Sequence, residues 1–167
     1  MEPGNFKLNE TVFYSAQGVY TITGQTVRDF LGEKKPYLEL TPVSEHNAKI
    51  YVPLDNAVAF GKMQPLLSKQ ECLNLLQVEG EQECGWILND SERKTAYSAV
   101  LSGTDRGALL HMVRCLNRHR LQQGKKGKKL HLADERFLKN AQRLLVEELS
   151  LVLQVEQEKA TALVLGQ

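Results

Sequence analysis

One tryptophan and a run of basic residues are the side chains of this protein best suited to chemistry with a nucleic acid. Trp86 is the single tryptophan among 167 residues, and it lies in Cys84-Gly85-Trp86-Ile87-Leu88-Asn89-Asp90, between two segments predicted to be helices. An indole can insert against a base step, while lysine and arginine side chains neutralise phosphates. By position alone, Trp86 also fits a second interpretation, in which it packs as an ordinary core residue.

The charge changes sign along the chain. Residues 1–83 contain 7 basic residues (Lys and Arg) and 11 acidic ones (Asp and Glu). Residues 84–143 contain 13 basic and 5 acidic residues, and residues 144–167 contain 1 basic and 4 acidic residues. Basic residues that neutralise phosphates release counterions, which gives affinity without base preference and with strong salt dependence. No recognition-helix pattern that would read base edges is found. The predicted contacts with a DNA backbone are Arg93, Lys94, Arg114, Arg118, Lys125, Lys126, Lys128 and Lys129.

The cysteines and histidines could in principle serve redox or metal chemistry. Cys72, Cys84 and Cys115 are odd in number and contain no CxxC pair, so we expect reduced, partly buried thiols and no disulfide. His111, Cys115 and His119 follow at steps of four on one helix face, which is open to a metal. Apolar neighbours surround Cys115 in the sequence, however, and favour a core position. We therefore predict no metal site.

Motifs of enzymes are missing from the sequence. It contains no GxxxxGK[ST], GxGxxG, HExxH or GxSxG, and Cys84 has no evident base partner. The acidic pairs Asp134-Glu135 and Glu147-Glu148 follow an exposed helical rhythm. We predict a protein that is not an enzyme, with no cofactor and no small-molecule substrate.

Composition indicates a folded protein of one or two small domains. Hydrophobic residues make up 42% and charged residues 25% of the chain, as in globular domains. No apolar run approaches the ~20 residues that span a bilayer, and the first residues lack the features of a signal peptide. A cytoplasmic protein without a membrane partner is expected.

Residues 6–56 are predicted to form short antiparallel strands, at 11–14, 18–28, 36–41 and 49–52. Leu38 and Leu40 share one face of the third strand, as Ile50 and Val52 do in the fourth. One buried face and one wet face is the antiparallel pattern. So short a segment predicts a small, strongly bent sheet of the SH3 or Tudor kind, whose edge can pair with a partner's strand.

After Pro53 the hydrophobic period becomes helical. Ser68-Lys69-Gln70-Glu71 is a capping box, followed by a buried stripe at Leu73 and Leu76. Three further helices are expected: one at 91–101, a second that begins after a cap at Thr104 or Asp105, and a third from about 132 to beyond 153. A basic loop covers 123–129, and the tail from Glu158 should fray. The predicted fold class is α+β: a Tudor/SH3-like antiparallel β domain, residues 1–62, followed by a compact all-helical domain, residues 63–167.

Several short runs of the sequence occur in a characteristic order and spacing: 6–14, 18–20, 37–40, 50–53 with Asn56, Trp86, Ser102-Gly103, 112–116 and 141–149. Together these runs resemble the CarD/CdnL family of bacterial RNA-polymerase-binding transcription regulators. The resemblance extends from about residue 6 to residue 153. The β half alone is also similar to the polymerase-interacting module of transcription-repair coupling factors, but the chain has no room for their helicase motor.

The resemblance implies a Tudor-like domain that docks on the β subunit of RNA polymerase, partly by strand pairing. It also implies a helical domain on promoter DNA at the upstream edge of the transcription bubble, where the family's tryptophan wedges into the minor groove and hinders bubble collapse. Trp86 matches that wedge, and Arg28 matches a basic position used against polymerase. The implied polymerase-binding residues are Arg28, Lys49, Ile50, Tyr51, Val52 and Pro53.

Three positions depart from the family pattern. Tyr51 stands where Arg often precedes Val-Pro, with Lys49 two residues earlier on the same face, so we expect a rearranged polymerase contact. About three extra residues between Trp86 and Ser102 leave open which of Arg93 and Lys94 matches a DNA contact. His131 replaces a helix-capping Ser, which predicts a weaker helix start.

Taken together, the residues and the resemblance predict a bacterial, nucleoid-associated transcription regulator that binds the polymerase β subunit and stabilises the promoter open complex without base-sequence specificity. A Tudor-like protein–protein adaptor, with a helical scaffold and no DNA role, is the alternative from another class. A second alternative is a DNA-binding protein that acts without polymerase.

Overall fold

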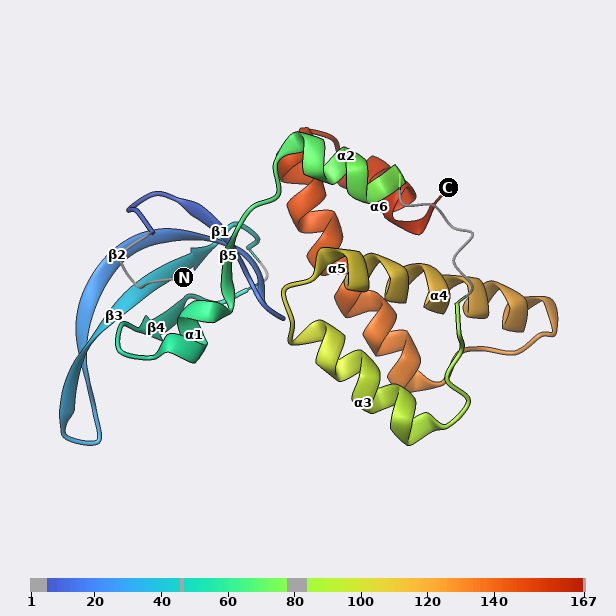
Figure 1. Ribbon diagram of the computed structural model, residues 1–167, viewed down its shortest axis with the longest axis horizontal. Coiled ribbons are helices and arrows are strands. Elements are labelled where there is room, and N and C mark those ends of the chain that lie inside the picture. The colour runs from blue at the N-terminus through green and yellow to red at the C-terminus, as the bar shows by residue number, and fades with distance from the viewer. Residues whose placement is uncertain (1–5, 46, 78–83, 167) are drawn as a thin grey trace. The chain divides into compact units, whose positions relative to one another are not determined.

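The computed structural model describes residues 6–45, 47–77 and 84–166 (Figure 1). The chain divides into two compact units, Met1–Leu66 and Leu67–Gln167. The first unit contains an antiparallel five-stranded sheet and the second is helical, so the predicted α+β fold class is confirmed.

The sheet of the first unit has the strand order β4-β3-β2-β1-β5. Its long central hairpin is irregular between Ile22 and Gly24, where the register shifts. Such a bulge bends a strand and increases its twist, consistent with the curved hairpin in Figure 1. The strands are β1 Thr11–Tyr14, β2 Gly18–Phe30, β3 Glu33–Pro42, β4 Ile50–Pro53 and β5 Met63–Pro65, with the short helix α1 Ala57–Gly61 before β5.

The core of this unit lies on the face predicted from the alternation of residue types. Leu40 and Val52 are buried in one cluster, and Leu38 and Ile50 pack against it partly buried. The remaining cluster members are Val12, Tyr20, Ile22, Phe60 and Met63. Phe13 and Val19, the neighbours of Val12 and Tyr20 along β1 and β2, are also fully buried, so only part of the opposite face is exposed.

Two elements of this unit were not predicted. Asn56 caps α1, its Oδ1 accepting a hydrogen bond from Ala59 N at 3.1 Å. β5 pairs with β1 in the register Val12↔Pro65, so residues 63–65 belong to the sheet although the prediction placed them in the helical domain. A three-residue strand is too short for its alternation to be recognised in a sequence.

The second unit is built around one long helix, α5, which contacts α2, α3, α4 and α6. Its core consists of leucines and small residues facing inward from α4 and α5, among them Leu109, Val113, Leu116, Leu138, Ala141, Leu145 and Leu149. The helices are α2 Lys69–Gln77, α3 Asp90–Leu101, α4 Arg106–Lys125, α5 Leu132–Leu153 and α6 Gln157–Leu165.

Local capping signals were predicted well. Ser68 Oγ accepts from Glu71 N at 3.1 Å and Glu71 Oε2 accepts from Ser68 N at 2.7 Å, which confirms the capping box. Asp105 caps α4, its Oδ1 accepting from Ala108 N at 3.1 Å. His131 makes no side-chain hydrogen bond at the start of α5, as its chemistry predicted.

The predictions for the C-terminal tail and for the buried face of α2 are wrong. The segment from Glu158 forms α6, because Ala160 and Val164 are fully buried and hold it in place. In α2 the buried residue is Cys72, and Leu73 is 39% exposed. A capping box determines where a helix begins, but its rotation follows from the surface it packs on. Burial raises the pKa of the Cys72 thiol to about 11.

Within the described part of the chain, no helix combines the length and the apolarity that crossing a membrane requires.

Candidate nucleic-acid interface

Trp86 is partly buried and lies in the segment between residue 84 and α3. Its ring stacks on His119 of α4, with centroids 3.7 Å apart and planes 11° apart, and Arg93 Cζ lies 4.8 Å from the ring centroid. Burial lowers the pKa of His119, which favours a neutral imidazole at neutral pH. The indole is thus held in one orientation while part of it remains accessible.

An open hollow of about 350 Å³ borders the indole. Arg118 is exposed and contributes a positive charge to the hollow, and His119 and Gln122 lie along the same side of α4. The complete lining is Cys84, Gly85, Trp86, Cys115, Arg118, His119 and Gln122. A partly exposed indole beside a cationic side chain is an arrangement that can bind a nucleotide through stacking and charge.

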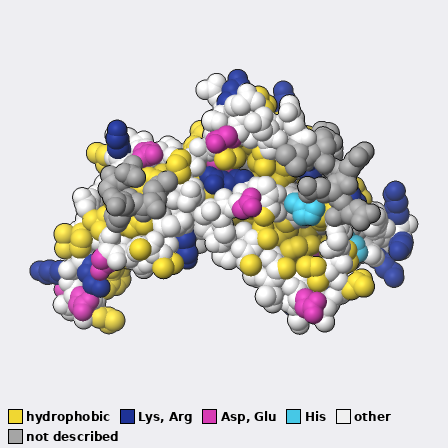
Figure 2. All heavy atoms as spheres, viewed as in Figure 1, with side chains coloured by type: hydrophobic (Ala, Val, Ile, Leu, Met, Phe, Trp, Pro, Cys, Tyr) yellow, Lys and Arg dark blue, Asp and Glu magenta, His cyan; other side chains and the backbone are white. Residues whose placement is uncertain are grey.

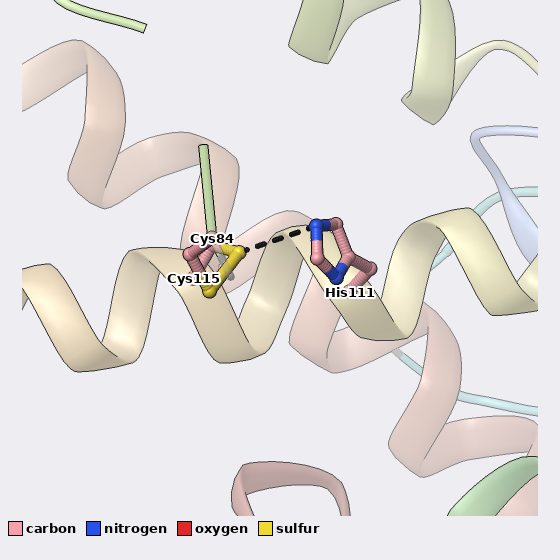
Figure 3. The surroundings of a disulfide bond; sticks show 3 residues. All are labelled: Cys84, His111 and Cys115. Carbon is pink, nitrogen blue, oxygen red and sulfur yellow. Dashed lines mark hydrogen bonds between the residues drawn. A yellow bond between two sulfur atoms is a disulfide. The ribbon is translucent and has the colours of Figure 1, made fainter. Parts of the chain in front are cut away.

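Cys84 and Cys115 form a disulfide, with Cα atoms 5.2 Å apart, so the prediction of reduced thiols at these positions is wrong. The sequence separation of 31 residues gives no sign that the Trp86 segment returns to α4. His111 lies one turn before Cys115, and its Nε2 is 3.5 Å from Cys115 Sγ (Figure 3). Cys72 is a free, buried thiol. Among the residues that the structure describes, no three His, Cys, Asp or Glu side chains are grouped as metal ligands.

Arg93 is the centre of a buried ion-pair network that we call the Arg93 clamp. Its Nε and Nη2 donate to the Asp134 carboxylate at 2.9 and 2.8 Å, and Nη2 also donates to Asp90 Oδ1 at 2.7 Å. Its Nη1 donates to the carbonyl of Ile87 at 2.8 Å, one residue after Trp86. The Asp134 hydrogen bond raises the pKa of Arg93. The clamp therefore ties the Trp86 segment to α3 and α5.

This arrangement argues against the predicted DNA contact of Arg93. Its side chain is only 4% exposed, and its guanidinium is committed to acceptors inside the unit. A phosphate could replace those acceptors only by leaving the buried Asp134 unpaired, which is strongly unfavourable. Lys94, the next residue, is exposed and stays in the predicted set.

A second buried ion pair, Arg106 with Glu148, was also missed. Arg106 Nε and Nη2 donate to Glu148 at 3.0 and 3.1 Å, and Glu148 accepts from Leu67 N at 2.9 Å. Asp134 and Glu148 are each 1% exposed, so the prediction that they lie on an exposed helix face is wrong for both. The sequence did contain a signal for the burial of these two acids, because they lie at three- or four-residue steps from the apolar stripe of α5 at Leu138, Ala141 and Leu145.

The other predicted basic residues separate into two groups. Arg114 donates from Nε and Nη2 to the carbonyls of Val164 and Leu163, both at 3.3 Å, and so caps the end of α6, which argues against its predicted DNA contact. Arg118 and the lysines at the α4–α5 connection are exposed. Figure 2 shows Lys and Arg side chains gathered at the end of the helical unit where α4 meets α5. This lysine turn consists of Lys125, Lys126, Lys128 and Lys129.

In the β unit, the structure brings together residues of the predicted polymerase site from β2 and β4. Arg28 Cζ lies 3.8 Å from the ring centroid of Tyr51, across the intervening strand β3. Lys49 Nζ donates to Glu39 Oε1 at 3.1 Å, and this bond lowers the pKa of Glu39. Val52 is 1% exposed, so its side chain belongs to the core and only its backbone lies at the sheet edge.

Each of the two units matches a protein-family model. The CarD-like/TRCF RID domain matches residues 6–67, and the CarD C-terminal domain matches residues 73–165. The chain belongs to the CarD family. As a CarD-family protein it is an RNA polymerase-interacting transcription regulator, and the family consists of non-enzymatic transcription factors. The resemblance predicted from the short runs is confirmed, while the roles of individual residues stay predictions.

Proposed function

We propose that this CarD-family protein binds the β subunit of RNA polymerase through its β unit and stabilises the promoter open complex by wedging Trp86 at the upstream edge of the bubble. The observation that carries the proposal is the state of Trp86, an indole oriented by the His119 stack and left partly accessible beside Arg118. Neither feature selects a base, so the proposed action has no sequence specificity.

The physical argument concerns the balance between the open and the reannealed promoter. Stacking an aromatic side chain on an unpaired base contributes roughly 1–3 kcal/mol. The stack on His119 and the Arg93 clamp already order the indole, which lowers the entropic cost of using it. Docking on polymerase supplies a high effective concentration at the bubble edge, because the wedge by itself binds weakly.

The β unit supports the polymerase part of the proposal. β4 is an edge strand, and its backbone can be extended by a partner's strand. Arg28 stacked on Tyr51 presents a cation and an aromatic ring, residue types enriched at protein interfaces. Tyr51 takes the place of the arginine that the family often carries, and in our proposal its stack with Arg28 forms part of a rearranged polymerase contact.

We expect Arg28→Glu to weaken binding of the purified polymerase β subunit by about tenfold or more, because reversing a charge in an interface replaces attraction with repulsion. Equilibrium binding of the full-length variant to immobilised β subunit measures the effect. Lys62→Glu is the control, since Lys62 is also exposed in the β unit but lies at the end of α1. Equal affinities of the Arg28→Glu and native proteins would contradict the assignment.

We expect replacement of the four residues of the lysine turn by glutamine to reduce the salt dependence of binding to forked DNA. The slope of log K against log salt should decrease by about 0.9 for each phosphate that the variant no longer neutralises, equally for different DNA sequences. Lys159→Gln on α6 is the control, as an exposed lysine outside the basic block. An unchanged slope would mean that the lysine turn does not bind DNA.

The stack on His119 is also what the adaptor alternative requires, because there Trp86 serves only to pack. That alternative predicts no affinity for forked DNA and no response of Trp86 fluorescence when DNA is added. A DNA-binding protein acting alone predicts instead that polymerase leaves promoter occupancy unchanged. The same titrations, with and without polymerase, therefore separate all three functions.

A further inference from the structure

The Trp86 segment is attached to the helical unit at three points. The Cys84–Cys115 disulfide lies two residues before the indole, the His119 stack holds the indole itself, and the Arg93 clamp binds the carbonyl of Ile87 after it. Cys115 and His119 are one turn apart on α4, so the disulfide and the stack act on the same helix face. Of the three attachments, the disulfide alone can be made and broken by chemistry.

The surroundings of this disulfide differ from those of the remaining cysteine. Cys84 is partly exposed and lines the hollow beside Trp86, whereas Cys72 is fully buried, with its pKa raised to about 11. His111 Nε2 lies 3.5 Å from Cys115 Sγ, as Figure 3 shows, and Arg118 lines the same hollow. A hydrogen-bonding group beside a sulfur atom stabilises the thiolate, which is the leaving group when a disulfide is reduced, and a nearby positive charge attracts the attacking thiolate.

We propose that Cys84 and Cys115 are a reversible redox site that fixes the Trp86 segment on α4 when oxidised and releases the start of that segment when reduced. The site takes a low-molecular-weight thiol or its disulfide as its reaction partner. Its regulatory consequence rests on the proposed function of Trp86: the oxidised form orders the segment more fully in advance, and the reduced form, held by the stack and the clamp alone, must complete that ordering during binding.

The exchange balances as follows for a thiol RSH and its disulfide RSSR. In reduction, a thiolate RS⁻ attacks the more exposed Cys84 sulfur, and the Cys115 thiolate leaves beside His111 Nε2 and takes up a proton from water. A second RS⁻ then attacks the sulfur of R in the mixed disulfide, forming RSSR and releasing the Cys84 thiolate, which takes up a proton. Two electrons pass from two RSH to the protein disulfide. Oxidation is the reverse, with RSSR as the oxidant.

The test equilibrates the full-length protein with reduced and oxidised glutathione at a series of ratios. The reaction is then quenched, and free thiols are alkylated in denaturant and counted by intact mass. We expect one two-electron transition, from one alkylated cysteine to three, because Cys72 is free throughout. Trp86 emission, the signal of the single tryptophan, should change with the same midpoint.

Variants test whether the transition arises from the Cys84–Cys115 pair. Cys84→Ser and Cys115→Ser should each abolish it, whereas the matched control Cys72→Ser should leave its midpoint unchanged. His111→Gln should slow reduction by about tenfold without changing either end state, since the leaving thiolate loses the imidazole that lies against its sulfur. Three free thiols at every ratio would overturn the proposal, and so would a transition that leaves Trp86 emission unchanged.

A final comparison separates this inference from the proposed function. Oxidised protein should prolong open-complex lifetime about twofold to tenfold more than reduced protein, the effect of ordering one side chain in advance. If Trp86→Ala shortens the lifetime but the two redox forms act equally, the regulatory inference fails and the wedge stands. If neither change affects the lifetime while the emission transition persists, the wedge fails and the redox site stands.

Discussion

Trp86→Ala is expected to shorten the lifetime of the promoter open complex by several-fold to about a hundredfold, on promoters that the native protein stabilises. The stacking removed amounts to roughly 1–3 kcal/mol, and 1.4 kcal/mol corresponds to a factor of ten. The measurement is the decay of preformed open complexes after a competitor traps free polymerase. Affinity for the polymerase β subunit should not change, because Trp86 belongs to the helical unit.

His119→Ala is the matched control for this experiment. It removes the partner of the stack, worth about 0.5–1.5 kcal/mol, but keeps the indole, so it should shorten the lifetime less than Trp86→Ala does. Equal effects of the two variants would indicate that the stack acts through the fold of the segment. An unchanged lifetime with Trp86→Ala would refute the wedge.

Asp134→Asn is expected to lower the free energy of unfolding by about 3–5 kcal/mol, because it leaves the buried Arg93 guanidinium without its main partner. Urea denaturation followed by circular dichroism measures the loss. Glu135→Gln is the control, as the neighbouring acid outside the clamp, and should change the stability by less than about 1 kcal/mol. A loss as small as that of the control would mean that Arg93 does not depend on Asp134.

The double variant Arg93→Met with Asp134→Leu tests both the clamp and the corrected role of Arg93. Replacing a buried ion pair by apolar residues of similar volume is often neutral, so the double variant should recover most of the stability that Asp134→Asn removes. Its salt dependence in DNA binding should match the native protein, because Arg93 binds no phosphate in our proposal. A slope reduced by about one would restore Arg93 to the DNA-binding set.

The parts of this fold that the sequence predicted are governed by neighbours in the chain. Leu38 and Leu40, or Ser68 and Glu71, lie two or three residues apart, so strand alternation and helix capping place them whatever packs beyond. The family resemblance drew on the same local runs and predicted the order of the two units. Trp86 was identified by its type and by the basic block that follows it.

What only the tertiary structure decided is which distant groups meet. Asp134 lies 41 residues from Arg93, Cys115 lies 31 from Cys84, and Val164 lies 50 from Arg114. A charged residue carries the same local signal whether it faces solvent or a buried partner, so its pairing depends on how the helices pack. Packing thus removed Arg93 and Arg114 from the exposed basic surface and fastened the indole to α4. The sequence by itself determined that this chain has a single tryptophan at the start of a basic block, because residue type and order suffice for that.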